Sequence, residues 1–270
     1  MSYSLYKILK FTHKEFLGDI SYFLSFLTRW VGLTISAFLF YFLSKMIGRG
    51  QVGSLTFYGG DYFSFMLVGL AATSIFTSVM NGLPGTVGRE QSSGTLEVIL
   101  TTPTSLWELI CAFSFYNILM GTLTAAVCIL LGNFLGVGFS GVNVAAVILT
   151  LLLSSMIFMS LGLLSVSGLI AFKRGDPLSW IAGNVIWLLG GFYFPVSVFP
   201  ESIQKISYWL PSTYAFHALR LAVLKGFSIK MLEYEIFVLG VFAVGLSITG
   251  VLIFKSALTY AKKRGTIIFQ

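Results

Sequence analysis

The chain has 270 residues, of which 56% are hydrophobic, 16% are aromatic and only 10% are charged. Soluble domains carry about 25% charged residues, so this composition excludes an ordinary soluble protein and indicates an integral membrane protein. The net charge of +7 lies mainly in short segments between apolar runs. That distribution is typical of a topology signal, so we expect no nucleic-acid partner.

The N-terminal segment 3–20 is predicted to form an amphipathic helix on the inner membrane surface. Its apolar residues fall near one face, whereas Lys7, Lys10 and Lys14 share another face at spacings of three and four. Basic amphipathic helices of this kind bind the membrane interface and its lipids. A solvated lead-in to the first membrane span is the alternative.

Uncharged runs divide the rest of the chain into lengths of about 20 residues, which suit membrane-spanning helices. The run 109–172 is too long for one helix and divides at the glycine-rich segment 132–143. We therefore expect six spans, at 28–47, 62–87, 107–132, 143–172, 177–194 and 236–257.

The basic residues predict how these spans are oriented. An even number of spans places both termini on one side, and eleven of the 17 lysines and arginines then lie on that side. Basic segments tend to remain in the cytoplasm. Both termini are therefore predicted to be cytoplasmic, and the expected location is the inner membrane of a prokaryotic cell.

The segment 195–226 holds three of the six prolines, yet it remains apolar and aromatic. Proline limits helix length, so we expect two short helices, one opened by Pro200 and one capped by Ser212. We interpret the segment as a re-entrant helical hairpin in the outer leaflet, with an amphipathic extracellular loop as the alternative. His217 and Arg220 share one face of the second helix, as candidate contacts for lipid headgroups or an acidic substrate group.

Residues that could carry chemistry are nearly absent from the predicted spans. Ion-coupled transport normally needs ionisable residues within the membrane, so the pattern argues against an ion-coupled carrier and against a membrane hydrolase. The sequence has no GxxxxGK[ST] motif, so the chain is not expected to bind ATP through a phosphate-binding loop. The two cysteines, Cys111 and Cys128, form no metal-binding pattern with His13 or His217. We expect no metal and no cofactor on this chain.

One polar stretch, GREQSSGTLEVILTTP at 88–103, interrupts the apolar sequence on the predicted cytoplasmic side. Thr95 can cap a short helix at 94–102 outside the membrane, and Pro103 ends it. Leu96, Ile99 and Leu100 share one face of this helix. Such an apolar stripe suits a groove on a partner protein, and the alternative is a stripe that lies on the membrane surface.

Two sequences resemble the permeases of the type-2 ATP-binding-cassette export family: REQSSGTLEVILTTPTS at 89–105 and FPVSVFPESIQKISYWLPSTYAFHALR at 194–220. The resemblance implies an all-α membrane protein with a single permease domain over 1–270. It implies an interface helix, six transmembrane helices, a cytoplasmic coupling helix between spans two and three, and a re-entrant hairpin before span six. It also implies a second permease copy, as a homodimer, over two ATPase subunits that bind the ATP and Mg²⁺.

The resemblance assigns contact with the ATPase to one set of residues: Arg89, Glu90, Gly94, Thr95, Leu96, Glu97, Ile99, Leu100 and Pro103. Plainer alternatives stay open for four of them. Arg89 and Glu90 can simply end the second span, Gly94 can serve only as a turn residue, and Glu97 can be a solvated charge.

The implied function is ATP-driven export of a hydrophobic or amphipathic substrate, such as a drug, an antibiotic, a peptide or a lipid. The chain itself is then a transport subunit and not an enzyme. The G-T-L-E run favours these substrates over polysaccharides or glycolipids, whose export is the alternative. An ion-coupled carrier or a channel is the rival from another class of protein.

Overall fold

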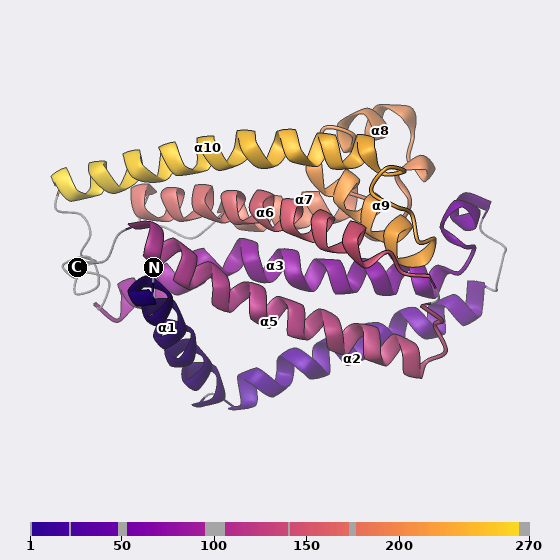
Figure 1. Ribbon diagram of the computed structural model, residues 1–270, viewed down its shortest axis with the longest axis horizontal. Coiled ribbons are helices and arrows are strands. Elements are labelled where there is room, and N and C mark those ends of the chain that lie inside the picture. The colour runs from indigo at the N-terminus through magenta and orange to yellow at the C-terminus, as the bar shows by residue number, and fades with distance from the viewer. Residues whose placement is uncertain are drawn as a thin grey trace.

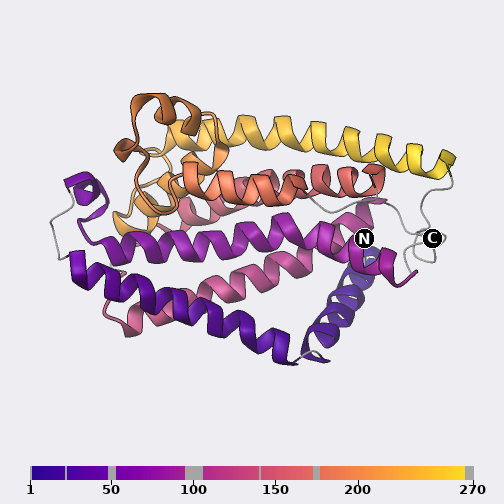
Figure 2. The same ribbon diagram turned by 180° about the vertical axis from the view of Figure 1, so that it is seen from behind.

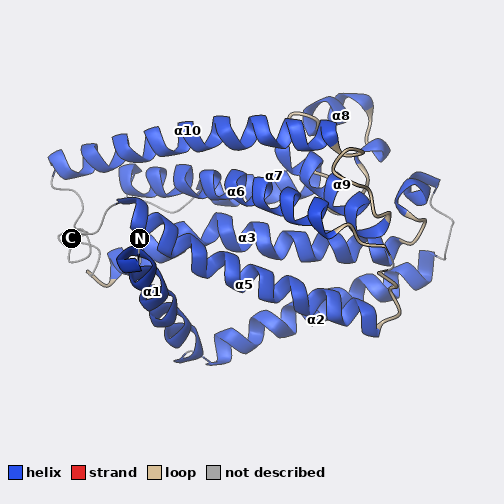
Figure 3. Ribbon diagram, viewed as in Figure 1, coloured by secondary structure: helices blue, strands red, loops and turns tan. Residues whose placement is uncertain are grey.

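The computed structural model describes residues 2–21, 23–47, 53–94, 106–139, 141–172 and 177–264, and every regular element in these ranges is helical (Figure 3). The long helices are α1 (Ser2–Ser21), α2 (Phe23–Ile47), α3 (Tyr62–Ser92), α5 (Leu106–Phe134), α6 (Val144–Phe172) and α10 (Glu233–Arg264). The short ones are η1 (Gly53–Tyr58), α7 (Pro177–Leu189), η2 (Val196–Val198), α8 (Glu201–Ser207) and α9 (Pro211–Leu224). The predicted all-α class is confirmed.

Five of the described helices are long and apolar enough to cross a membrane: α2, α3, α5, α6 and α10. They fall on five of the six predicted spans. The span predicted at 177–194 differs, because α7 has 13 residues and ends at Leu189. At 1.5 Å per residue such a helix is about 20 Å long, which is shorter than the hydrocarbon core of about 30 Å. Gly191, at φ +83°, turns the chain away from the helix axis.

The molecule has two ends, which we name the α1 end and the α9 end (Figures 1 and 2). The last turns of α10 lie at the same end of the molecule as α1, and the short helices α8 and α9 lie at the other end (Figure 1). Helix α6 runs from the α9 end, where Ala146 shares a buried cluster with Ala218, to the α1 end, where Ile170 shares one with Phe113. The chain must therefore return before α9 begins, and α7 is the described helical part of that return.

Helix α3 is the central helix, lying between α5 and α6 in both views (Figures 1 and 2). Its side chains Phe65, Met66, Phe76, Met80 and Leu83 are each no more than 1% exposed. Burial of side chains this large supplies most of the packing energy of a helical bundle. Helix α3 therefore forms the buried centre against which α5 and α6 pack.

Helix α3 continues through a proline, Pro84, where a helix often breaks. Proline has no N–H, so the carbonyl four residues earlier, that of Met80, lacks its usual helical donor. Gly162 of α6 packs against this carbonyl, since a Cβ placed on it would lie 2.6 Å from the Met80 oxygen. The missing side chain at Gly162 lets α6 approach α3 closely at this point.

Apolar side chains also cover the outer faces of the bundle. Ile35 and Phe42 of α2 are each 62% exposed, and Phe237 of α10 is 70% exposed. Exposure of such faces to water is unfavourable in free energy, whereas lipid tails solvate them well. With five apolar helices of membrane-spanning length, the chain is a multi-pass membrane protein.

The predicted hairpin segment 195–226 contains two short helices, α8 and α9. Pro200 precedes α8 as expected, but α9 begins at Pro211 and its first turn has no side-chain cap. The expectation that Ser212 caps this helix is wrong, because Ser212 lies inside the first turn. Its hydroxyl points to the Ile186 carbonyl oxygen, 3.5 Å away, and so joins α9 to α7.

Candidate functional site

The described members of the predicted coupling set lie at the α1 end, in the last turns of α3 and just after them. Arg89 and Glu90 lie in the last turns of α3, and Gly94 follows that helix. The other members of the set lie outside the described residues: Thr95, Leu96, Glu97, Ile99, Leu100 and Pro103. The structure therefore shows how the two flanks of the predicted coupling helix are held.

Gly94 occupies a turn that ends α3. Its φ is +69°, in the left-handed region that glycine adopts without strain. A Cβ placed on Gly94 would meet nothing within 4 Å. In the described structure the left-handed backbone conformation accounts for a glycine at this position.

Helix α1 holds the end of α3 through two ion pairs. Arg89 Nη2 lies 2.7 Å from Glu15 Oε2, and Lys14 Nζ lies 2.5 Å from Glu90 Oε1. The two carboxylates are buried, at 9% and 6% exposure, whereas the side chains of Arg89 and Lys14 are about 60% exposed. Because a buried carboxylate needs a partner, each cation compensates an acid that water does not reach well.

Helix α1 also holds the start of α5, on the other flank of the predicted coupling helix. Lys7 Nζ lies 3.4 Å from Glu108 Oε2, and the Tyr116 hydroxyl donates a hydrogen bond to Asp19 Oδ2 at 2.5 Å. The rings of Phe11 and Phe113 pack at a centroid distance of 4.6 Å. We call these contacts, together with the two ion pairs to α3, the α1 clamp.

The α1 clamp changes the interpretation of the lysine face of segment 3–20. Two of its three lysines, Lys7 and Lys14, pair with Glu108 and Glu90 of the protein itself. The sequence analysis did not predict that α1 packs against α3 and α5, because it gave no role to Glu15 and Asp19. These acids are four residues apart, a helical spacing that places them on one face and offered a signal for a protein partner.

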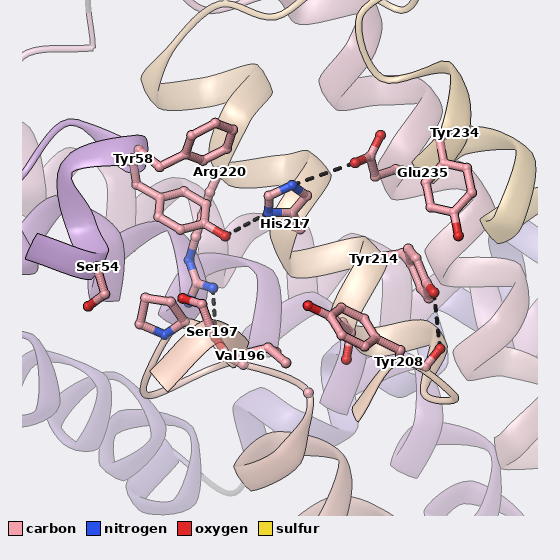
Figure 4. Close-up of a pocket in the computed structure, with 15 residues that line it drawn as sticks. Ser54, Tyr58, Val196, Ser197, Tyr208, Tyr214, His217, Arg220, Tyr234 and Glu235 are labelled. Carbon is pink, nitrogen blue, oxygen red and sulfur yellow. Dashed lines mark hydrogen bonds and ion pairs between the residues drawn. The ribbon is translucent and has the colours of Figure 1, made fainter. Parts of the chain in front are cut away.

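The second candidate region is a cavity of about 720 Å³ at the α9 end (Figure 4). Its wall comes from η1, the turn after α7, the segment between α8 and α9, α9 itself and the first turn of α10. The lining residues are Ser54, Phe57, Tyr58, Gly190, Gly191, Pro195, Val196, Ser197, Tyr208, Thr213, Tyr214, His217, Arg220, Tyr234 and Glu235. Sequence reasoning singled out His217 and Arg220 but not the tyrosines or Glu235.

The structure places Arg220 inside the protein, in the wall of this cavity. Its side chain is 2% exposed, and its guanidinium lies 3.5 Å from the centroid of the Phe65 ring. Its Nε donates to the Phe65 carbonyl at 3.1 Å, Nη1 to that of Gly191 at 2.7 Å and Nη2 to that of Phe192 at 2.8 Å. Arg220 therefore joins α9 to α3 and to the turn after α7, and it does not face lipid.

His217 lies between a tyrosine and a carboxylate (Figure 4). Its Nδ1 is 2.6 Å from the Tyr58 hydroxyl, and its Nε2 is 3.5 Å from Glu235 Oε1. The His217 ring also stacks on Phe57 at an interplanar angle of 6°. Burial lowers the pKa of His217 below its usual 6.5, while the Glu235 carboxylate acts in the opposite direction. Burial therefore favours the neutral imidazole.

Comparison with known proteins covers most of this architecture, but not α10. A family model described as ABC-2 type transporter matches residues 4–224, from α1 through α9. No curated protein matches the chain. The match covers well over half of the 270 residues and includes both candidate regions up to the end of α9. The chain therefore belongs to the ABC-2 type transporter family and is a membrane-embedded permease subunit of that family.

Proposed function

We propose that this permease is the membrane subunit of an ATP-driven exporter that moves a hydrophobic or amphipathic substrate out of the cytoplasm or inner leaflet. A separate ATPase subunit supplies the energy and carries the ATP and Mg²⁺. The observation that supports this proposal most directly is the α1 clamp, which binds α1 to both flanks of the segment 95–105.

In this proposal the ATPase engages the segment 94–102 through Leu96, Ile99 and Leu100. Movement of that segment passes into the last turns of α3 through Arg89 and into the first turn of α5. Helix α1 moves with them, because ion pairs hold it to both helices. Since α3 is the central helix, its displacement reaches the cavity at the α9 end through the bundle core.

The expected assembly is two copies of this chain over two ATPase subunits in a prokaryotic inner membrane, with both termini cytoplasmic. The proposal then places the α1 end in the cytoplasm and the segment 195–226 in the outer leaflet as a re-entrant hairpin. The position of α1 and the last turns of α10 at the same end supports an even number of crossings (Figure 1).

The test measures ATP hydrolysis with the purified permease in vesicles, with and without its ATPase. The permease alone is expected to be inactive, and transport should require both proteins. Glu15→Gln removes the charge that pairs with Arg89 and should lower the coupling of hydrolysis to transport several-fold. Glu201→Gln is the matched control, because Glu201 is exposed in α8 at the other end.

Two results would contradict the proposal. One is ATP hydrolysis by the permease after every other polypeptide has been removed. The other is transport of a substrate that proceeds at the full rate without ATPase and ATP.

A further inference from the structure

The cavity at the α9 end has the volume of a small-molecule site. Its volume is about 720 Å³, and sites for drug-sized ligands usually occupy about 300–1,000 Å³. It lies at the end of the molecule opposite α1, away from the predicted contact with the ATPase (Figure 1). Its chemistry can therefore be considered separately from coupling.

Aromatic rings form much of the cavity wall. Tyr208, Tyr214 and Tyr234 lie together on one side of His217 (Figure 4). The Tyr214 and Tyr234 rings have a centroid distance of 6.0 Å, and the Tyr214 hydroxyl donates to the Tyr208 carbonyl at 3.0 Å. Tyr234 is 63% exposed, so part of its ring is open to a ligand. Faces of aromatic rings attract cations through their quadrupole.

A carboxylate adjoins these rings. The Glu235 side chain is 16% exposed, follows Tyr234 in the chain and points toward His217 (Figure 4). Its Oε1 lies 3.5 Å from His217 Nε2, a contact that is an ion pair only when the imidazole is protonated. Because burial favours the neutral imidazole and the contact is long, His217 compensates the carboxylate charge only weakly.

Arg220 also lines the cavity and keeps its positive charge, but each of its nitrogen atoms is already engaged within the protein, and it lies on the opposite side of His217 from Glu235 (Figure 4). Its three nitrogen atoms donate to the carbonyl oxygens of Phe65, Gly191 and Phe192, and the side chain is 2% exposed. An anionic ligand would compete with these bonds and would be repelled by Glu235. A neutral apolar ligand would remove water from Glu235 without replacing it by a partner, which is costly.

We propose that this cavity is a binding site for an organic cation with an apolar body, such as a protonated amine, a quaternary ammonium or a phosphonium. Glu235 receives the charge, and the rings of Tyr208, Tyr214 and Tyr234 cover the body. The inference concerns binding by this chain alone, so it stands or falls independently of the ATPase partnership.

The test uses two probes of the same shape and opposite charge, tetraphenylphosphonium and tetraphenylborate. Each is titrated calorimetrically into the purified permease in a nonionic detergent without ATPase. Detergent partitioning is subtracted with protein-free micelles. Wild-type permease should bind the phosphonium and should bind the borate far more weakly, because only the cation is complementary to the carboxylate.

Glu235→Gln keeps the shape of the side chain and removes its charge, and should weaken phosphonium binding by about tenfold or more. Glu233→Gln is the matched control, since Glu233 is exposed in the same turn of α10 and does not line the cavity. Tyr234→Leu keeps an apolar side chain and should weaken binding by about 2- to 5-fold through the loss of the ring face.

Equal phosphonium binding by wild type and Glu235→Gln, or equal loss of both probes, would overturn the proposal. Size-exclusion chromatography checks that each variant remains folded. If Glu235→Gln proves unstable, Tyr234→Leu decides the question, and an unchanged ratio of phosphonium to borate affinity in that variant would also overturn it.

A lipid ammonium headgroup shares this cation chemistry. Short-chain phosphatidylethanolamine is therefore added as a competitor, with phosphatidylglycerol of the same chain length as the control. Competition by the ethanolamine lipid alone, absent in Glu235→Gln, would assign the site to a headgroup. Absence of competition would assign it to a free organic cation.

Discussion

Replacing Arg220 with methionine tests whether the buried guanidinium holds the α9 end together. The substitution keeps a long side chain but removes the donors to the Phe65, Gly191 and Phe192 carbonyls. Phe65 lies inside α3, whereas the Gly191 and Phe192 carbonyls lie outside any helix and are left without a helical donor. An unsatisfied buried carbonyl costs about 1–3 kcal/mol, so two of them cost about 2–6 kcal/mol. Methionine also removes the desolvation cost of a buried charge. A net loss of about 2–4 kcal/mol is therefore expected.

The assay is thermal unfolding of the purified permease in detergent, followed by the fluorescence of its tryptophans. For a chain of this size 1 kcal/mol corresponds to about 2–4 °C, so the apparent melting temperature should fall by roughly 5–15 °C. Lys225→Met is the matched control, because this lysine is exposed at the end of α9. If Arg220→Met melts with the wild type, the three carbonyl bonds do not stabilise this end, and the reasoning is refuted.

Two further predictions concern helix packing and pH. Gly162→Ala should lower the apparent melting temperature, because its Cβ would lie 2.6 Å from a backbone oxygen of α3 and such overpacking costs about 1–3 kcal/mol. Gly245→Ala in α10 is the control, because its Cβ would meet nothing within 4 Å, and it should be neutral or slightly stabilising. Equal melting temperatures of the two variants would contradict the close approach of α6 to α3. Burial lowers the pKa of His217, so the unfolded chain binds the proton first and stability should fall as the pH drops below 6.5. Melting curves measured across this range should show a smaller loss for His217→Asn than for wild type, whereas His13→Asn, which changes an exposed histidine, should follow the wild type.

The sequence predicted best what depends on local composition. Long apolar runs identify α2, α3, α5, α6 and α10, because a span is a property of about 20 consecutive residues. The same criterion predicted a longer helix at 177–194 than the 13 residues of α7. The apolar run continues to Phe194 there, but the glycines after Leu189 turn the chain, and hydropathy alone does not distinguish a turn from a helix.

Contacts between distant segments were not predictable from local patterns. Arg220 meets carbonyl oxygens that lie 155, 29 and 28 residues away, so nothing near it in sequence shows that it is buried and satisfied. The sequence analysis gave Glu15 no role, yet this residue pairs with Arg89, 74 residues later. Such pairings depend on how distant helices pack together, so residue spacing within one helix does not reveal them.

The central claim is that the segment 94–102 docks the permease onto an ATPase. Leu96→Asp with Ile99→Asp replaces two apolar side chains, each worth about 1.5–3 kcal/mol when buried, by carboxylates. The affinity for the ATPase should fall more than about 100-fold. Thr101→Asp is the control, because helical spacing places residue 101 away from the apolar stripe.

The measurement is the amount of ATPase that copurifies with a tagged permease from the membrane. The double variant should insert in the membrane at the normal level and lose the ATPase, whereas Thr101→Asp should retain it. Full stoichiometry of ATPase on the double variant, with export unchanged, would contradict the account.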